Sequence, residues 1–170
     1  MEHSGRLPPT DFYTAAKLTQ FVSIDLLLYF EGKVLLGLRK NEPAKGTWFV
    51  PGSKVYKGEL LSDAINRIAT MELGIKLDHS KIKKNGVYEH VYYNNFTDDS
   101  FGTHYVAFPI EYHLDVDERD IIENKIIKDM VFDTQHLDVL WLTPSELLDR
   151  VDVHPYTKYY FSTNPPNKFI

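Results

Sequence analysis

The stretch GSKVYKGELLSDAINRIATMELGI, residues 52–75, combines a helix signal with charged residues at fixed spacing. Its apolar residues recur at helical spacing, and they are Leu61, Ala64, Ile65, Ile68 and Met71. Gly74 supplies a C-terminal stop, because glycine readily adopts the left-handed conformation that ends many helices. The stretch therefore predicts a helix over residues 59–73 that follows a loop.

The charged residues of this stretch resemble the Nudix box. Its pattern is Gly, a five-residue spacer, Glu, a seven-residue spacer, then Arg-Glu-apolar-any-Glu-Glu-any-Gly-apolar. The positions that agree are Glu59, Arg67, Glu72, Gly74 and Ile75. Ser53 replaces the first Gly, and Ile68 and Met71 replace two Glu residues. The resemblance implies phosphate and divalent-metal chemistry, while the missing carboxylates argue against the usual cleavage of a pyrophosphate.

Each box residue also has an ordinary interpretation when it is taken alone. Glu59 would favour the positive end of the helix dipole, and Arg67 could pair with Asp63 four residues earlier. Glu72 could be a surface residue at the helix end, where a carboxylate is mildly unfavourable unless a cation compensates it. The specificity therefore lies in the pattern as a whole.

Other parts of the chain point to one branch of that family. The matching stretches are VSID (22–25), LLGLR (35–39), GTWFVPG (46–52), GVYEH (86–90), NNF (94–96), THYV (103–106) and QHLDVLWLT (135–143). Together they resemble the GDP-mannose mannosyl hydrolases. That branch lacks the same two carboxylates, attacks the sugar carbon instead of phosphorus, and releases GDP and free sugar with inversion. The resemblance implies Mg²⁺-dependent hydrolysis of a GDP-hexose and leaves the hexose open.

The resemblance also implies one Mg²⁺ per subunit, with Mn²⁺ as an alternative. The expected ligands are the main-chain carbonyl of Gly52, the carboxylate of Glu72 and the side-chain amide of Gln135. Mg²⁺ takes about six oxygen ligands and often keeps waters and substrate phosphates. A site with a single carboxylate therefore draws the rest of its ligands from elsewhere.

Catalytic roles follow from the same resemblance. They fall on His136, Asp25, Arg39, Lys54 and Arg67. His136 is the expected general base, because inversion needs an activated water opposite the leaving group and imidazole titrates near pH ~6.5. Arg39 and Lys54 would stabilise the leaving diphosphate, although Lys54 replaces an arginine and lacks its two-pronged geometry. Arg67 would help to hold Glu72.

Substrate-binding roles complete the set that the resemblance implies. They fall on Leu7, Phe12, Arg39, His90 and Tyr105. Phe12 would pack on the base with Leu7 beside it, and Tyr105 would donate to the diphosphate. Asp25 and His90 would lie near the sugar and diphosphate. From the residues alone, Phe12 and Tyr105 are as readily core aromatics, and His90 a packing residue. Asp25 is harder to dismiss, because a carboxylate within an apolar strand needs a partner or a function.

Two departures from the branch keep other functions open. If position 53 needs a positive φ, Ser53 would strain the loop and shift the carbonyl of Gly52. Together with Lys54, it motivates one alternative, a catalytically weak Nudix protein that binds nucleotide sugars. A further alternative is a Nudix pyrophosphohydrolase, which would yield GMP and a sugar phosphate.

Length and composition fit one domain over residues 1–170, with residues 1–10 as an N-terminal arm. The net charge of −5 gives no basic surface for nucleic acid. The absence of cysteine excludes disulfides and thiolate sites and fits a reducing cytoplasm. The start of the chain lacks the apolar run of a signal peptide, and no run of ~18 apolar residues could span a membrane. The family resemblance implies a homodimer.

Short strands and helices interleave along the rest of the chain. Predicted strands cover 21–30, 33–39, 47–50, 86–93, 103–112 and 139–142, and further helices begin at 143–144 and near 154. The segment 113–134 is interpreted as a linker with an acidic run. Without a regular βαβ order, this pattern predicts an α/β (α+β) fold with a mixed β-sheet sandwiched between helices, and the family resemblance implies that this is the Nudix fold.

Overall fold

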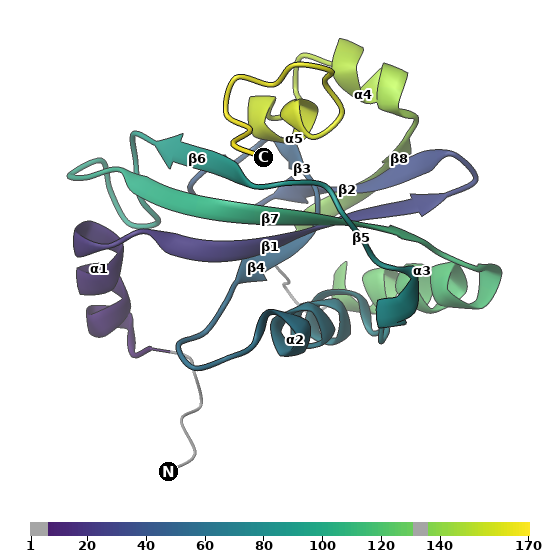
Figure 1. The fold of residues 1–170 in the computed structure, drawn as a ribbon, viewed down its shortest axis with the longest axis horizontal. Coiled ribbons are helices and arrows are strands. Elements are labelled where there is room, and N and C mark those ends of the chain that lie inside the picture. Colours follow the sequence, from purple (N-terminus) through teal and green to yellow (C-terminus); the bar gives the residue numbers. More distant parts are fainter. Residues whose placement is uncertain (1–6, 131–135) are drawn as a thin grey trace.

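The computed structural model describes residues 7–130 and 136–170, with side chains described outside residues 126–137 (Figure 1). The strands are β1 Phe21–Phe30, β2 Lys33–Arg39, β3 Trp48–Phe49, β4 Gly52–Lys54, β5 Lys83–Lys84, β6 Tyr88–Tyr92, β7 Thr103–His113 and β8 His136–Leu142. The helices are α1 Pro9–Leu18, α2 Leu61–Leu73, α3 Val116–Met130, α4 Pro144–Asp149 and α5 Pro155–Tyr159, with a 3₁₀ turn, η1, at His79–Lys81.

The strands form one mixed sheet, as predicted. Its main path has the order β3-β2-β1-β7-β5, while β4 pairs with β1, β6 with β7 and β8 with β2. β1 and β7 run parallel, and the pairs formed by β2, β4, β5, β6 and β8 are antiparallel. Helices α2 and α3 lie on one face, and α4 and α5 lie on the other (Figure 1). The predicted layers are therefore confirmed.

Side chains of β1 alternate between two hydrophobic cores, because successive residues of a strand point to opposite faces. Ile24, Leu26 and Leu28 pack in the core that α2 covers. Leu27 packs in the second core, which also contains Leu147 of α4. By the same alternation, Asp25 falls on the face of the second core. The fold thus carries a carboxylate into an apolar layer.

Several predicted elements are confirmed to within two residues. β1 and β2 have the predicted bounds, and α2 begins two residues later than predicted. Gly74 ends α2 in the left-handed conformation, with φ 75°, and its N–H bonds to the carbonyl of Thr70. Thr143 caps α4 in a capping box with Glu146. These elements depend on local signals that the sequence displays directly.

Two helices were not predicted. α1 includes Pro9 and Thr10, so the described part of the arm 1–10 is partly helical. Its sequence signal is a proline at the first helical position, which favours helix initiation. α3 occupies the segment interpreted as a linker, where Ile122 is fully buried against the core of α2. Tertiary packing there outweighs an acidic local composition.

The strand boundaries also differ in places. β8 begins at His136, three residues before the predicted start, and β6 is shorter than the predicted strand 86–93. The short strands β4 and β5 were not predicted, because two or three residues carry no periodic signal. Among the described residues, no helix has both the length and the apolar character needed to cross a bilayer.

Candidate active site

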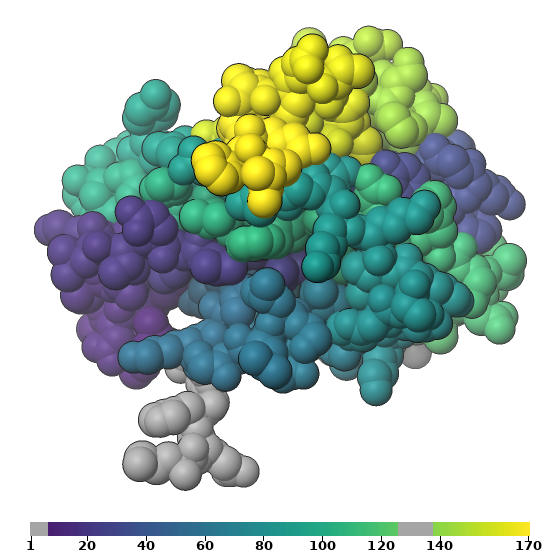
Figure 2. Space-filling model, viewed as in Figure 1, coloured from purple at the N-terminus to yellow at the C-terminus, as the bar shows by residue number. Residues whose placement is uncertain are grey.

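A cleft of about 770 Å³ opens at one end of the sheet. Figure 2 shows a hollow between α1, in purple, and α2, in blue. The predicted site residues that line it are Phe12, Asp25, Arg39, Gly52, Lys54, Glu72, His90 and Tyr105. They come from α1, β1, β2, β4, α2, β6 and β7, so seven elements place them around one space. The structure thus brings most of the predicted set together.

Leu7 and Arg67 are absent from the described lining, and the side chains of Gln135 and His136 lie outside the described part of the chain. Leu7 is 41% exposed and lies before α1. Arg67 lies on α2 and bonds to the loop that precedes this helix. Gln135 lies outside the described residues. The backbone of His136 begins β8 and pairs in register with Arg39, which lines the cleft.

Asp25 has a partner that the sequence did not reveal. Asp25 is 6% exposed, and the hydroxyl of Tyr160 donates to its Oδ2. Burial raises the pKa of this carboxyl to about 6, while the bond from Tyr160 and the charge of Arg39 oppose that rise. The expectation that a carboxylate in this strand needs a partner is therefore confirmed.

His90 also contacts Tyr160, with 3.0 Å between its Nε2 and the hydroxyl oxygen. The imidazole is stacked on the ring of Tyr156, with centroids 4.3 Å apart and planes 3° apart. Burial and, to a smaller extent, charge repulsion from His154 lower the pKa of His90 to about 3. His90 is therefore a neutral ring at the cleft wall.

Arg39 contributes a positive charge to the cleft. Arg39 donates from Nε to the carbonyl of Pro43 at 3.0 Å, which fixes the guanidinium beside the loop after β2. Burial and, to a smaller extent, the charge of Arg39 lower the pKa of His154 to about 4. Arg39 also opposes the rise that burial causes in the pKa of Tyr105. Both effects place Arg39 electrostatically within the cleft.

An aromatic cluster lines the end of the cleft at α1. Phe12 stacks on Phe96, with centroids 4.5 Å apart, and on Phe21, with centroids 5.2 Å apart. The Nζ of Lys54 lies 3.2 Å from the centroid of Phe12. Phe12 is half-buried and lines the cleft, so it is both a packing residue and a wall residue. The two interpretations of Phe12 are compatible.

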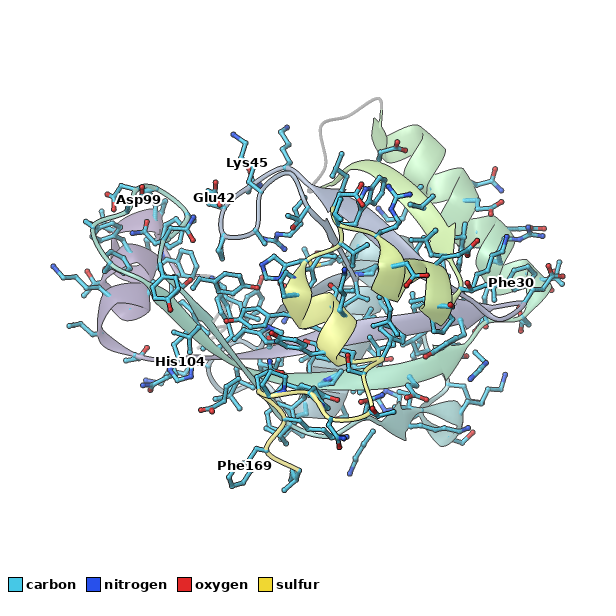
Figure 3. All side chains as sticks on the ribbon, turned by 90° about the horizontal axis from the view of Figure 1, so that it is seen from above. Phe30, Glu42, Lys45, Asp99, His104 and Phe169 are labelled. Carbon is cyan, nitrogen blue, oxygen red and sulfur yellow. The ribbon has the colours of Figure 1, made fainter. Side chains whose placement is uncertain are left out.

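Two loops beside the cleft are in contact with each other. Figure 3 shows the loop of Glu42 and Lys45 next to the loop of Asp99. The side-chain amide of Asn94 donates to Oε2 of Glu42 at 2.9 Å, which joins these loops. A hydrogen bond between polar side chains therefore connects the two loops.

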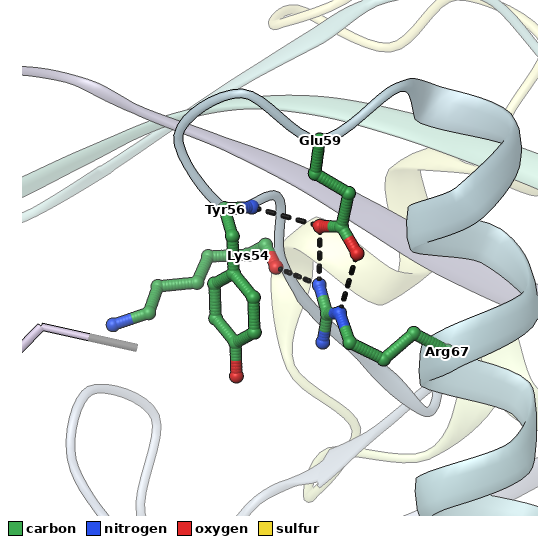
Figure 4. A network of polar contacts seen from close by, with 4 residues as sticks. All are labelled: Lys54, Tyr56, Glu59 and Arg67. Carbon is green, nitrogen blue, oxygen red and sulfur yellow. Dashed lines mark hydrogen bonds and ion pairs between the residues drawn. The ribbon is translucent and has the colours of Figure 1, made fainter. Parts of the chain in front are cut away.

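Arg67 holds the loop that leads into α2 (Figure 4). Its Nε and Nη2 donate to the two carboxylate oxygens of Glu59 at 2.7 and 2.8 Å, and Nη2 also donates to the carbonyl of Lys54 at 2.9 Å. Glu59 in turn accepts the N–H of Tyr56 at 2.9 Å. Arg67 thus bonds to Glu59 instead of Asp63, and Glu59 acts as an acceptor ahead of the helix.

The region of Gly52 has a close contact that requires glycine. A β-carbon at Gly52 would lie 2.5 Å from Oδ1 of Asp25 and 2.7 Å from the carbonyl oxygen of Ile24. Ser53 of β4 pairs with Ile24 of β1, and Ser53 is not among the described residues that have a positive φ. The backbone strain that a positive φ would cause at Ser53 is therefore not found. Serine stands in place of glycine here, and the strand β4 still forms.

The donor set fits a cation with few protein ligands. Gly52 and Glu72 both line the cleft. Ile68 is 1% exposed and packs in the core, and Met71 lines the cleft with a thioether in place of a carboxylate. Within the described residues no cluster of three or more His, Asp or Glu residues could hold a metal. An ion held here would complete its shell with water and phosphate oxygens, as Mg²⁺ commonly does.

Tyr92 lines the cleft, and Tyr160 and His154 contact residues that line it; none of the three was predicted as a site residue. Tyr160 bonds to Asp25 across 135 positions of the chain, and no spacing rule connects such residues. His154 caps α5 by accepting the N–H of Tyr156. Tyr92 lies on β6, two positions after His90, and it also lines the cleft. Alternation along β6 from His90 to Tyr92 was the signal for this last residue.

Comparisons with known proteins agree with the fold. A family model described as NUDIX domain matches residues 20–161. The chain is 36% identical over 155 residues to low-salt glycan biosynthesis protein Agl8 of Haloferax volcanii, covering 91% of this chain and 88% of that protein. It is also similar to the solved MutT NUDIX hydrolase from Burkholderia pseudomallei, with TM-score 0.60, 24% identity and coverage of 84% and 96%. The MutT protein from Methanosarcina mazei Go1 gives TM-score 0.59, 18% identity and coverage of 84% and 90%. The two structures support the fold.

Proposed function

Because the chain belongs to the NUDIX family of hydrolases, we propose that it hydrolyses a GDP-hexose of the GDP-mannose type to GDP and free sugar. Water attacks the anomeric carbon, and the configuration inverts. The observation that carries this proposal is the convergence of Arg39, Lys54 and Glu72 with Asp25 and His90 on one cleft. Such a cleft can hold an anionic diphosphate and a polar sugar side by side.

The box positions favour attack at carbon over attack at phosphorus. Cleavage of a pyrophosphate by several metal ions needs several carboxylates around the phosphates. Ile68 instead fills the core and Met71 presents a thioether, so Glu72 is the carboxylate that α2 brings to the cleft lining. One carboxylate suits one Mg²⁺ that assists the departure of GDP.

The chain's own residues would divide the work between the two halves of the substrate. Arg39 and Lys54 bind the diphosphate and stabilise the charge that grows on it as the bond breaks. Tyr105 donates to the same group. A bound Mg²⁺, held by Gly52, Glu72 and Gln135, would supply further charge neutralisation. His136, opposite Arg39 in the sheet register, accepts the proton of the attacking water.

The relative from Haloferax volcanii supports a sugar-containing substrate, since its name refers to glycan biosynthesis. By the family resemblance we also propose a cytoplasmic homodimer of one domain. Its molecular mass in solution would test the dimer.

Incubation with GDP-mannose and Mg²⁺ in ¹⁸O-labelled water tests the reaction. Label in the free sugar supports attack at carbon. Label in a phosphate, with GMP as a product, would instead establish a pyrophosphohydrolase. Tight binding of several GDP-hexoses without turnover would establish a nucleotide-sugar-binding protein.

The His136→Ala variant tests the assignment of the base. Its turnover should fall far more than its affinity for the substrate, because the proton acceptor is lost while the binding groups remain. His79→Ala is the matched control, since His79 is exposed in η1 and away from the cleft lining. Equal turnover in the two variants would remove His136 from this role.

A further inference from the structure

Three polar side chains meet in an apolar layer behind the cleft. The exposed fractions of Asp25, His90 and Tyr160 are 6%, 3% and 5%. Asp25 and His90 reach the cleft wall, whereas Tyr160 belongs to the second core behind them. Buried polar groups of this kind are costly unless their hydrogen bonds are satisfied. The arrangement of their hydrogen bonds is therefore informative.

The direction of each hydrogen bond follows from the count of protons. Tyr160 has one hydroxyl proton, and it donates that proton to Oδ2 of Asp25. The contact of 3.0 Å between Tyr160 and Nε2 of His90 then requires a proton on Nε2. A chain of donors thus runs from His90 through Tyr160 to Asp25. The low pKa of His90, about 3, agrees with a neutral ring that has one N–H to donate.

The surrounding rings restrict movement of this chain. Tyr160 contacts Tyr88 edge-on, with centroids 4.8 Å apart, and His90 is stacked on Tyr156. Oδ1 of Asp25 lies beside Gly52, in the space that a β-carbon would occupy. Oδ2 of Asp25 therefore accepts the hydrogen bond from Tyr160, while Oδ1 faces Gly52 of β4, which lines the cleft.

We propose that Tyr160 is a positioning residue whose hydroxyl holds Asp25 and His90 as one oriented unit at the sugar end of the cleft. Tyr160 acts through these two neighbours and not by contact with the substrate. The kinetic consequence rests on the proposed function, whereas the hydrogen-bond chain does not. The two can therefore be tested separately.

Nitrogen-15 NMR of the histidine side chains tests the chain without any substrate. At neutral pH, His90 should be uncharged with its proton on Nε2. In Tyr160→Phe, which removes only the hydroxyl, the two ring nitrogens of His90 should shift towards a mixture of tautomers. Tyr159→Phe is the matched control and should leave them unchanged. A wild-type His90 protonated on Nδ1, or unchanged His90 nitrogens in Tyr160→Phe, would overturn the proposal. If that variant does not fold, the wild-type tautomer decides alone.

Kinetics with GDP-mannose test the positioning role. Because one hydrogen bond contributes ~0.5–1.5 kcal/mol net, kcat of Tyr160→Phe should fall up to about tenfold, with KM changed less than about twofold. Equal kcat in Tyr160→Phe and wild type would refute positioning. A wild-type protein that turns over no GDP-hexose would contradict the proposed function, and the NMR result would still decide the hydrogen-bond chain.

Discussion

The pair formed by Glu59 and Arg67 should show strong energetic coupling when both side chains are replaced in a double-mutant cycle. The variants are Arg67→Met, which keeps an unbranched apolar stem but removes the guanidinium, Glu59→Gln, which keeps the shape of the side chain, and the combination. The side chains are only 19% and 14% exposed, and two N–H groups meet two carboxylate oxygens. Hydrogen bonds to charged groups contribute ~1.5–3 kcal/mol, so we expect a coupling free energy of about 2 kcal/mol.

The two single variants should differ in cost. Arg67→Met also removes the donor to the carbonyl of Lys54 and the cation over the ring of Tyr56, whose centroid lies 3.8 Å from the guanidinium carbon. Glu59→Gln retains one carbonyl oxygen that can still accept. Arg67→Met should therefore destabilise the protein more than Glu59→Gln.

Urea unfolding followed by circular dichroism measures all four proteins, with similar m-values required of each. Arg150 and Asp152 form a matched control, because they too are joined by two hydrogen bonds but are 39% and 43% exposed. Their coupling should be smaller, since solvent screens exposed pairs. A coupling below ~0.5 kcal/mol for Glu59 and Arg67 would lie within the error of additivity and refute the reasoning.

Three further predictions concern the site. Gly52→Ala should lower the free energy of unfolding by about 1–3 kcal/mol, because its β-carbon would overlap Asp25, whereas Ser53→Gly should bring no gain in stability; thermal melts that rank them otherwise contradict this. Because burial lowers the pKa of His90 to about 3 from 6.5, the unfolded chain takes up its proton first as pH falls. Stability from this group is complete above pH 6.5 and decreases below it, by about 2 kcal/mol at pH 5. Asp25 contributes with the opposite sign, so the difference between wild type and His90→Gln isolates the histidine, and equal pH slopes would exclude the effect. Glu72→Gln should raise the Mg²⁺ concentration for half-maximal activity by about tenfold or more, or about 1.4 kcal/mol; an unchanged Mg²⁺ titration would remove Glu72 from the ligand set.

The elements that the sequence predicted well are those whose signals are local. β1 and β2 are apolar runs separated by a turn, and α2 has an apolar face and a glycine stop. α3 was missed because its charged residues hide the few apolar positions, and Ile122 becomes recognisable as core only when α2 lies beside it. Local patterns cannot report such packing.

The site shows the same division. Asp25 was predictable because a carboxylate in an apolar strand is unusual, and the box pattern located Glu72 and Arg67. Tyr160 was not predictable, because its sequence context does not distinguish it from the other tyrosines of its aromatic cluster. Only the fold brings it against Asp25, which is 135 residues earlier in the chain. The packing of α5 against the sheet would have been needed to see it, because Tyr160 is the C-cap of that helix.

That long separation has a consequence for the order in which the protein matures. Asp25 leaves the ribosome early, whereas β7, its parallel neighbour strand, and Tyr160 are made much later. Contacts between such distant residues form slowly, because a long loop must close first. A nascent chain that stops before residue 160 would bury a carboxylate without its donor, at a cost of ~1–3 kcal/mol. The hydrogen-bond chain behind the cleft is therefore completed only after Tyr160 has been made, whereas the residues that line the cleft are made earlier.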